Sequence, residues 1–114
     1  MMTFIEAKEY YDRGNRNSKV KGRTLALALK LIKLDEDVYG VQHYDTIIVR
    51  IFSNNTYQIN NGGYYTATTK KHLNTYSGAN IRQVKGGWFL GDEMIPFKQD
   101  LRLDSKGRVL GEDR

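Results

Sequence analysis

The 114-residue sequence has no cysteine and only two histidines, His43 and His72. Disulfide scaffolds, thiolate zinc sites, iron–sulfur clusters and cysteine nucleophiles are therefore excluded, and an all-histidine metal site is disfavoured. The longest apolar-rich run, residues 25–34, contains Lys30 and Lys33 and is about half of the roughly 20 residues that a membrane helix needs. Because no signal-peptide pattern opens the chain, we expect a protein of the cytoplasm, or of a host cytoplasm, that uses no membrane, metal or cofactor.

Hydrophobic residues make up 39% of the chain and charged residues 27%, a balance typical of a polar globular protein. The length predicts a single domain over residues 1–114. The 18 lysines and arginines exceed the 13 acids, so the net charge is +5. This charge favours anionic partners, although it also serves solubility.

The N-terminal residues carry the signals of a short helix. Thr3 and Glu6 have the spacing of a capping box, and Gly14 is a stop signal. We therefore expect a helix over residues 4–13 within an N-terminal segment of residues 1–14. The polar and basic residues 15–23 predict a loop.

Alternation of apolar and polar residues predicts strands in the middle of the chain. Leucines at every second position predict one half-buried strand over residues 24–31. Further strands are expected over residues 38–43, 46–52 and 56–59. Apolar side chains on both faces of the segment 46–52 predict that this strand is covered on both sides.

Turn and cap signals organise the second half of the chain. Thr68 or Thr69 is expected to cap a helix over residues 70–76, which Gly78 ends. Gly86-Gly87 predicts a hairpin, Pro96 marks a strand start or edge, and residues 105–110 predict a last hairpin.

These elements predict an α+β fold. We expect an N-terminal helix followed by a small, bent, mainly antiparallel sheet, or a partly open barrel, over residues 24–103, with one short inserted helix. Residues 104–114 would then form a polar tail.

Two long stretches of the chain lack acidic residues, between Asp45 and Asp92 and between Arg13 and Lys33. Concentrated positive charge suits phosphate binding, because counterion release supplies most non-specific affinity for nucleic acid. Simple solvation of the surface is the alternative. The candidate phosphate contacts are Arg16, Lys19, Lys21, Arg23, Lys70, Lys71 and Arg82.

Aromatic residues stand near some of these cations. Tyr64 and Trp88 are candidates for stacking on bases, which suits binding of single strands. The alternative for Trp88, which directly follows a glycine turn, is a place in the core. The expected helix start at Thr68 and Thr69 is a candidate anion site, or merely a cap.

Catalytic patterns are weak. His43 and Asp45 are two residues apart and would share a strand face, but no nucleophile is tied to them by spacing. The acidic clusters at residues 35–37 and 92–93 match no metal-binding loop. We therefore expect a protein that is not an enzyme.

The stretch Asn60-Asn61-Gly62-Gly63-Tyr64-Tyr65-Thr66-Ala67-Thr68-Thr69-Lys70-Lys71-His72-Leu73-Asn74 resembles a motif of small uncharacterised bacteriophage proteins. The resemblance extends over about residues 38–97 and implies a viral origin, without a transferable activity. In element order, and in the spacing of residues 40–45, the chain also resembles Sm-like RNA-binding barrels, which have an SH3-like architecture. That likeness implies an RNA partner.

Three functions follow from these observations. The first is a nucleic-acid-binding accessory protein for RNA or single-stranded DNA, which contacts the phosphate backbone without reading sequence. The second is an interaction module that inhibits or adapts a host protein. The third is a self-assembling structural component, whose homo-oligomer would form through an exposed edge strand such as residues 38–43.

Overall fold

The computed structural model of the protein describes residues 1–14 and 22–111. The elements in chain order are α1 (Phe4–Gly14), β1 (Arg23–Ala26), β2 (Leu29–Asp35), β3 (Val38–His43), β4 (Thr46–Phe52), β5 (Tyr57–Ile59), α2 (Ala67–Ser77), β6 (Ile81–Val84), β7 (Gly87–Leu90), β8 (Ile95–Pro96) and β9 (Leu101–Leu103). All pairings between these strands are antiparallel.

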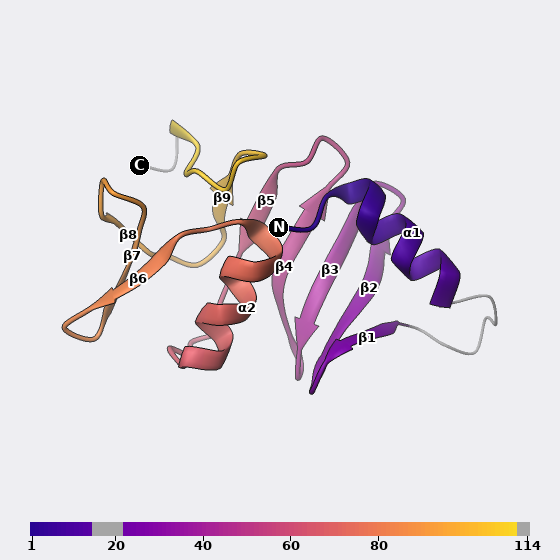
Figure 1. Ribbon diagram of the computed structural model, residues 1–114, viewed down its shortest axis with the longest axis horizontal. Helices are drawn as coiled ribbons and strands as arrows, with labels where there is room; N and C mark the ends of the chain where they lie inside the picture. Colours follow the sequence, from indigo (N-terminus) through magenta and orange to yellow (C-terminus); the bar gives the residue numbers. More distant parts are fainter. Residues whose placement is uncertain (15–21, 112–114) are drawn as a thin grey trace.

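The strands form two sheets. The large sheet has the order β1-β2-β3-β4-β5-β9, and the small sheet has the order β6-β7-β8. The predicted α+β class, with its N-terminal helix, mainly antiparallel sheet and inserted helix, is confirmed. Of the two predicted forms, the described strands adopt the open sheet and not a closed barrel (Figure 1).

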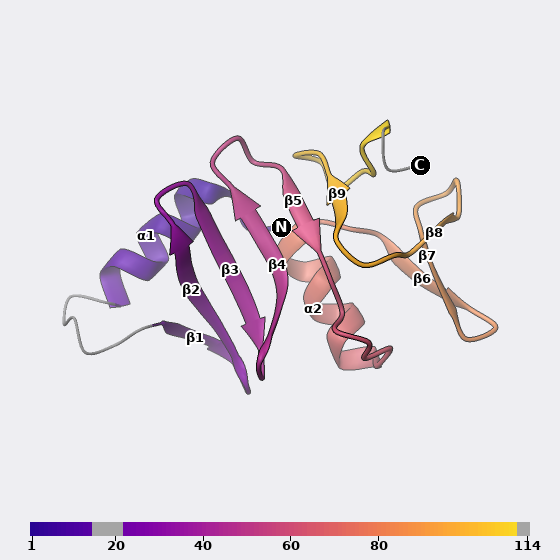
Figure 2. The same cartoon turned by 180° about the vertical axis from the view of Figure 1, so that it is seen from behind.

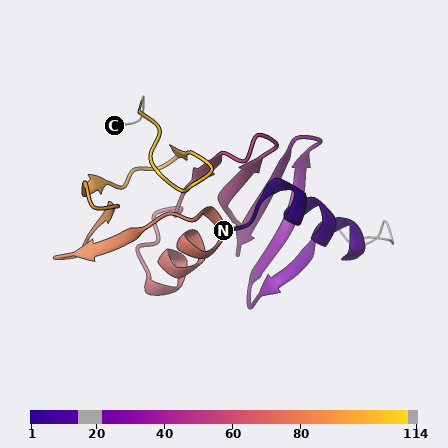
Figure 3. The ribbon, with the colours of Figure 1, turned by 45° about the horizontal axis from the view of Figure 1, so that its top comes forward.

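Both helices lie on one face of the large sheet. Figure 1 shows α1 and α2 in front of it, and Figure 2 shows that no described helix or strand covers the back. The helix α2 lies between α1 and the small sheet (Figure 3). The strand β4 is thus covered on one face only, and the two-sided cover predicted for residues 46–52 is wrong. Antiparallel sheets commonly leave one face to solvent.

The helix-covered face of the large sheet holds the core. One row of directly paired residues crosses five strands, and each of its members is 0% exposed. This row consists of Leu31, Val41, Val49, Ile59 and Leu101. A one-residue bulge in β4 buries Ile48 beside Val49.

The leucine-rich segment predicted as one strand folds as a hairpin instead. Leu27 and Ala28 form the turn between β1 and β2, and Ala28 has a φ of 56°. The Tyr44 amide donates a hydrogen bond to the Ala28 carbonyl over 2.9 Å. Leu27 is 92% exposed. Leucine and alanine are not typical turn residues, so the alternation of the sequence contains no signal for this break.

The predicted start of the first helix is confirmed. Glu6 Oε1 accepts a hydrogen bond from the Thr3 amide over 2.9 Å, and Thr3 Oγ1 accepts one from the Glu6 amide over 3.2 Å. Hydrogen bonds from the Thr3 amide and from the Thr3 side chain to the Glu6 carboxylate lower the pKa of that carboxyl. No helix within residues 1–14 and 22–111 is long and apolar enough to cross a membrane.

Other expectations hold in part. The strands predicted over residues 38–43 and 46–52 are confirmed, but the first pairs on both sides and is not an edge. The small sheet contains the predicted hairpin, with its turn at residues 85–86. Pro96 lies in the edge strand β8. The last turn brings Val109 back to Leu103.

Candidate functional site

The loop before α2 folds through the side chains of two asparagines. Asn60 Oδ1 accepts a hydrogen bond from the Gly62 amide over 2.6 Å, and Asn61 Oδ1 accepts one from the Gly63 amide over 2.8 Å. Asparagine side chains favour such turns because they bond to an amide two residues on. Both glycines have positive φ. The two turns reverse the chain and set Tyr64 at the start of the next segment.

Gly62 is expected to tolerate alanine less well than Gly63. A Cβ on Gly62 would lie 2.9 Å from the Thr46 side chain, whereas a Cβ on Gly63 would meet no atom. Both substitutions place alanine at positive φ, which costs about 1–2 kcal/mol. We expect Gly62→Ala to lose more stability than Gly63→Ala in urea unfolding. Equal losses would show that Thr46 does not constrain the loop.

The helix α2 begins at a threonine, but not at either of the predicted ones. Thr66 is the N-cap, and its Oγ1 accepts a hydrogen bond from the Thr69 amide over 3.2 Å. Thr69 is buried, and the two hydroxyls bond to each other over 2.9 Å. Three of the four residues 66–69 are threonines, and each can cap a helix, so the helix start predicted from the sequence was too late.

The far end of α2 is anchored to the small sheet. Asn74 Oδ1 accepts a hydrogen bond from the Ile81 amide over 2.9 Å, and Asn74 Nδ2 donates to the Ile81 carbonyl over 3.3 Å. Leu73 is fully buried against the large sheet, and Tyr76 is half-buried. Gly78 ends the helix with a φ of 72°, as its predicted role as a stop signal requires.

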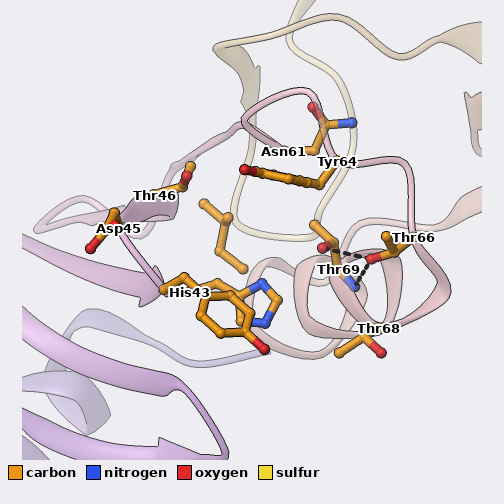
Figure 4. Close-up of a pocket in the computed structure, with 10 residues that line it drawn as sticks. His43, Asp45, Thr46, Asn61, Tyr64, Thr66, Thr68 and Thr69 are labelled. Carbon is orange, nitrogen blue, oxygen red and sulfur yellow. Dashed lines mark hydrogen bonds between the residues drawn. The ribbon is translucent and has the colours of Figure 1, made fainter.

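A pocket of about 480 Å³ lies where the loop, the start of α2 and the β3–β4 turn meet. Figure 4 shows the ring of Tyr64 on one side of this pocket and His43 on the opposite side. The other lining residues are Tyr44, Asp45, Thr46, Ile48, Asn61, Thr66, Thr68 and Thr69. Tyr44 is 69% exposed and Tyr64 is 63% exposed, so aromatic surface faces the solvent at this site.

The two histidines meet beside the pocket. The rings of His43 and His72 are 5.1 Å apart at 71°, and the Tyr44 ring lies 4.7 Å from His43. Burial, His43 and the Lys71 cation lower the pKa of His72. No three metal-ligating side chains come together in the part of the chain that the structure describes.

The charges around the pocket are unequal in sign. The first turn of α2 contains no acid, and Lys70 and Lys71 lie next to its positive dipole end. The charges of these lysines add to the partial positive charge at this end of the helix, so the region is electropositive. Lys70 Nζ donates to Gln83 Oε1 over 3.4 Å. Asp45, at the β3–β4 turn, is the one acid among the residues that line the pocket.

The predicted site residues are divided between places. Tyr64 lines the pocket, and Lys70 and Lys71 lie near the start of α2 without lining it. Arg23 lies elsewhere, against α1: its Nη1 donates to the Tyr10 carbonyl over 2.6 Å and its guanidinium covers the Tyr10 ring. Arg82 forms an exposed ion pair of 2.7 Å with Asp92.

Of the remaining predicted contacts, Trp88 is the one in the part of the chain that the structure describes. Trp88 is 3% exposed and packs edge-on against Tyr65 and Phe97, which supports its interpretation as a core residue. Arg16, Lys19 and Lys21 lie outside the described residues.

Tyr44 is a pocket residue that the sequence analysis did not select. It stands with Asp45 between two confirmed strands, and a turn between paired strands exposes its side chains. The turn position was the sequence signal that Tyr44 is exposed. Tyr44 and Tyr64 are far apart along the chain, so the sequence does not indicate that both line one pocket.

The fold and site describe a small α+β protein with an aromatic-walled pocket at a helix start. The family model described as Kyanoviridae Gp96 protein matches residues 7–105. The chain therefore belongs to this family of phage proteins. No curated protein and no solved structure matches the chain, so the comparisons add no support to the likeness with Sm-like barrels.

Proposed function

We propose that this phage accessory protein binds single-stranded nucleic acid and seats one nucleotide in the pocket at the start of α2. The observation that carries the proposal is the position of the Tyr64 ring opposite His43 across the pocket (Figure 4). Two such rings offer faces between which an unstacked base fits. Stacking on an aromatic side chain contributes about 1–3 kcal/mol per base and accepts any base.

The polarity of the pocket orients the bound nucleotide. The start of α2 has amide groups not used inside the helix, and Lys70 and Lys71 add positive charge, so this side suits a phosphate. Asp45 would repel a phosphate. Its carboxylate suits a base amino group or a ribose 2′-hydroxyl, both of which are hydrogen-bond donors.

The same features favour single strands over duplexes. A base inside a duplex is stacked on both faces and is not available to Tyr64 and His43, and freeing it costs a few kcal/mol. A 2′-hydroxyl at Asp45 would favour RNA over DNA.

The test is fluorescence anisotropy with labelled oligouridylate, oligothymidylate and a duplex of equal length. We expect the single strands to bind more tightly than the duplex. Each lysine contact contributes about −0.7 to the slope of log K against log salt, so two contacts weaken binding about sevenfold between about 50 and 200 mM salt. Absence of binding at low salt, or equal binding of duplex, would contradict the proposal.

A second candidate, an adaptor for a host protein, is favoured by one observation. Four of the exposed apolar residues, Leu27, Tyr44, Tyr64 and Tyr65, lie on the β1–β2 turn, the β3–β4 turn and the loop before α2. These segments form the lower edge of the molecule in Figure 1. Exposed apolar surface of this kind is typical of protein interfaces. Specific capture of one host protein, lost on Leu27→Ser and Tyr44→Ser, together with no binding of oligonucleotides, would establish this alternative.

A further inference from the structure

The bare face of the large sheet presents three rows of side chains to solvent. Successive residues of a strand point to opposite faces, so the residues between the core positions lie on the face without helices. The two longer rows consist of Thr24, Lys30, Gln42 and Ile47, and of Ile32, Gly40, Arg50, Gln58 and Arg102. A third, short row at one end of the face pairs Asp35, Val38 and Phe52. Figure 2 is the view onto this face.

The charge on the two longer rows has one sign, and the acid of the short row, Asp35, lies at the end of the face. The two longer rows contain the cations Lys30, Arg50 and Arg102, which lie on β2, β4 and β9, and they contain no acid. The Arg102 guanidinium lies 4.5 Å from the centre of the Phe52 ring, so a flat cationic and aromatic surface forms at one end of the second row. An anionic partner complements this surface.

A second copy of the chain fits the bare face poorly. A two-fold dimer sets the same patch against itself. Arg50, near the middle of its row, would then face the cations of the other copy. Like charges brought together without acids between them oppose association, so the charge favours a different, anionic partner.

The bare face is connected to the pocket. A shallow hollow lined by Thr24, Ala26, Ala28, Leu29 and Lys30 shares Tyr44 and Asp45 with the pocket. Tyr44 is exposed between the two hollows. A nucleic-acid strand that leaves the pocket over Tyr44 reaches Lys30 first and then the rest of the bare face.

We propose that a single strand of nucleic acid runs from the pocket over Tyr44 and across the bare face, with its phosphates at Lys30, Arg50 and Arg102. This inference rests on the proposed function and extends it to a second surface. The five strands from β2 to β9 span about 19 Å at the usual strand spacing. At about 3.4 Å or more per nucleotide, that distance holds up to about six nucleotides. Binding should therefore depend on strand length.

The experiment compares two variants that lose the same charge from opposite faces. Arg50→Gln with Arg102→Gln removes two cations from the bare face. Lys8→Gln with Arg13→Gln, the matched control, removes two from α1 on the covered side. Affinity is measured by anisotropy for a trinucleotide and for an oligothymidylate of about 12 nucleotides over a range of salt. Circular dichroism and urea unfolding report folding.

We expect the bare-face variant to reduce the salt slope for the long strand by about 1.4, since each single-strand phosphate contact contributes about 0.7. Trinucleotide affinity should be unchanged, and the α1 control should keep the wild-type slope. Arg50→Lys with Arg102→Lys should restore the slope, because the charge is kept. If Arg50→Gln with Arg102→Gln does not fold, Lys30→Gln, at an exposed position of β2, should lower the slope by about 0.7.

Three results would overturn the inference. An unchanged salt slope in the bare-face variant, when the wild type binds, would show that the bare face does not contact the nucleic acid. The proposed binding in the pocket would not be affected by that result. Equal binding of poly-glutamate at matched charge would show a general polyanion surface and not one for nucleic acid. No binding of any oligonucleotide by the wild type would remove both proposals.

Discussion

Leu73→Ala is expected to lower the free energy of unfolding by about 2–5 kcal/mol, the range for a buried leucine that leaves a cavity. Leu73 is fully buried on α2, which packs against β4 and β5. The loss has two parts, the transfer of the removed methyl groups and the unfilled space under a helix that cannot shift freely. The helix is held at both ends, by its contacts at Thr66 and through Asn74.

The matched control for this substitution is Leu27→Ala. Leu27 is 92% exposed at the β1–β2 turn, so its truncation should change stability by less than about 0.5 kcal/mol. Urea unfolding of the two variants measures the difference. A similar loss at both positions would contradict the hairpin, because a leucine in a half-buried strand would also cost stability when truncated. Circular dichroism of the folded variants would show that the secondary structure is retained.

Tyr64→Ala is expected to weaken single-strand binding about 5- to 150-fold, which corresponds to the loss of about 1–3 kcal/mol of stacking. Tyr64 is 63% exposed and forms a wall of the pocket, so its ring is available to a base. Stability should change by less than about 0.5 kcal/mol, as for other exposed side chains. Tyr64→Phe should bind like the wild type, because the aromatic face is kept.

The neighbouring tyrosine separates stacking from packing. Tyr65 lies 4.9 Å from the Trp88 ring and belongs to the aromatic cluster of the small sheet. Tyr65→Ala should lower stability and leave affinity of the folded protein unchanged. An affinity loss at Tyr65 as large as that at Tyr64, or no loss at Tyr64, would remove the pocket from the binding surface.

Some parts of the site were predictable because their signals are local. Tyr64, Lys70 and Lys71 lie within eight residues of one another. Because the loop leads directly into α2, Tyr64 precedes the helix start and the two lysines follow it, whatever the rest of the fold is. Thr66 was missed as the cap because Thr68 and Thr69 have the same chemistry. Only the hydrogen bond from the Thr69 amide distinguishes the three.

Other residues acquire their place only through distant pairing. Arg50 stands in a strand with apolar residues at most positions, and that pattern predicts cover on both faces. Whether a helix lies over a given face depends on where α1 and α2 pack, and no residue near Arg50 encodes that. The same holds for Tyr44, which lines the same pocket as Tyr64 although the two residues belong to segments far apart in the chain.

The sequence by itself determined the α+β class, the capping box at Thr3 and Glu6, two central strands and the turns at glycine. Each depends on hydrogen bonds or alternation within a few residues, so a short window contains the information. The tertiary structure decided the hairpin at Leu27 and Ala28, the bare face of the large sheet and the pocket between the β3–β4 turn and α2. These depend on which surfaces are buried together, and burial is settled by contacts between segments far apart in the chain.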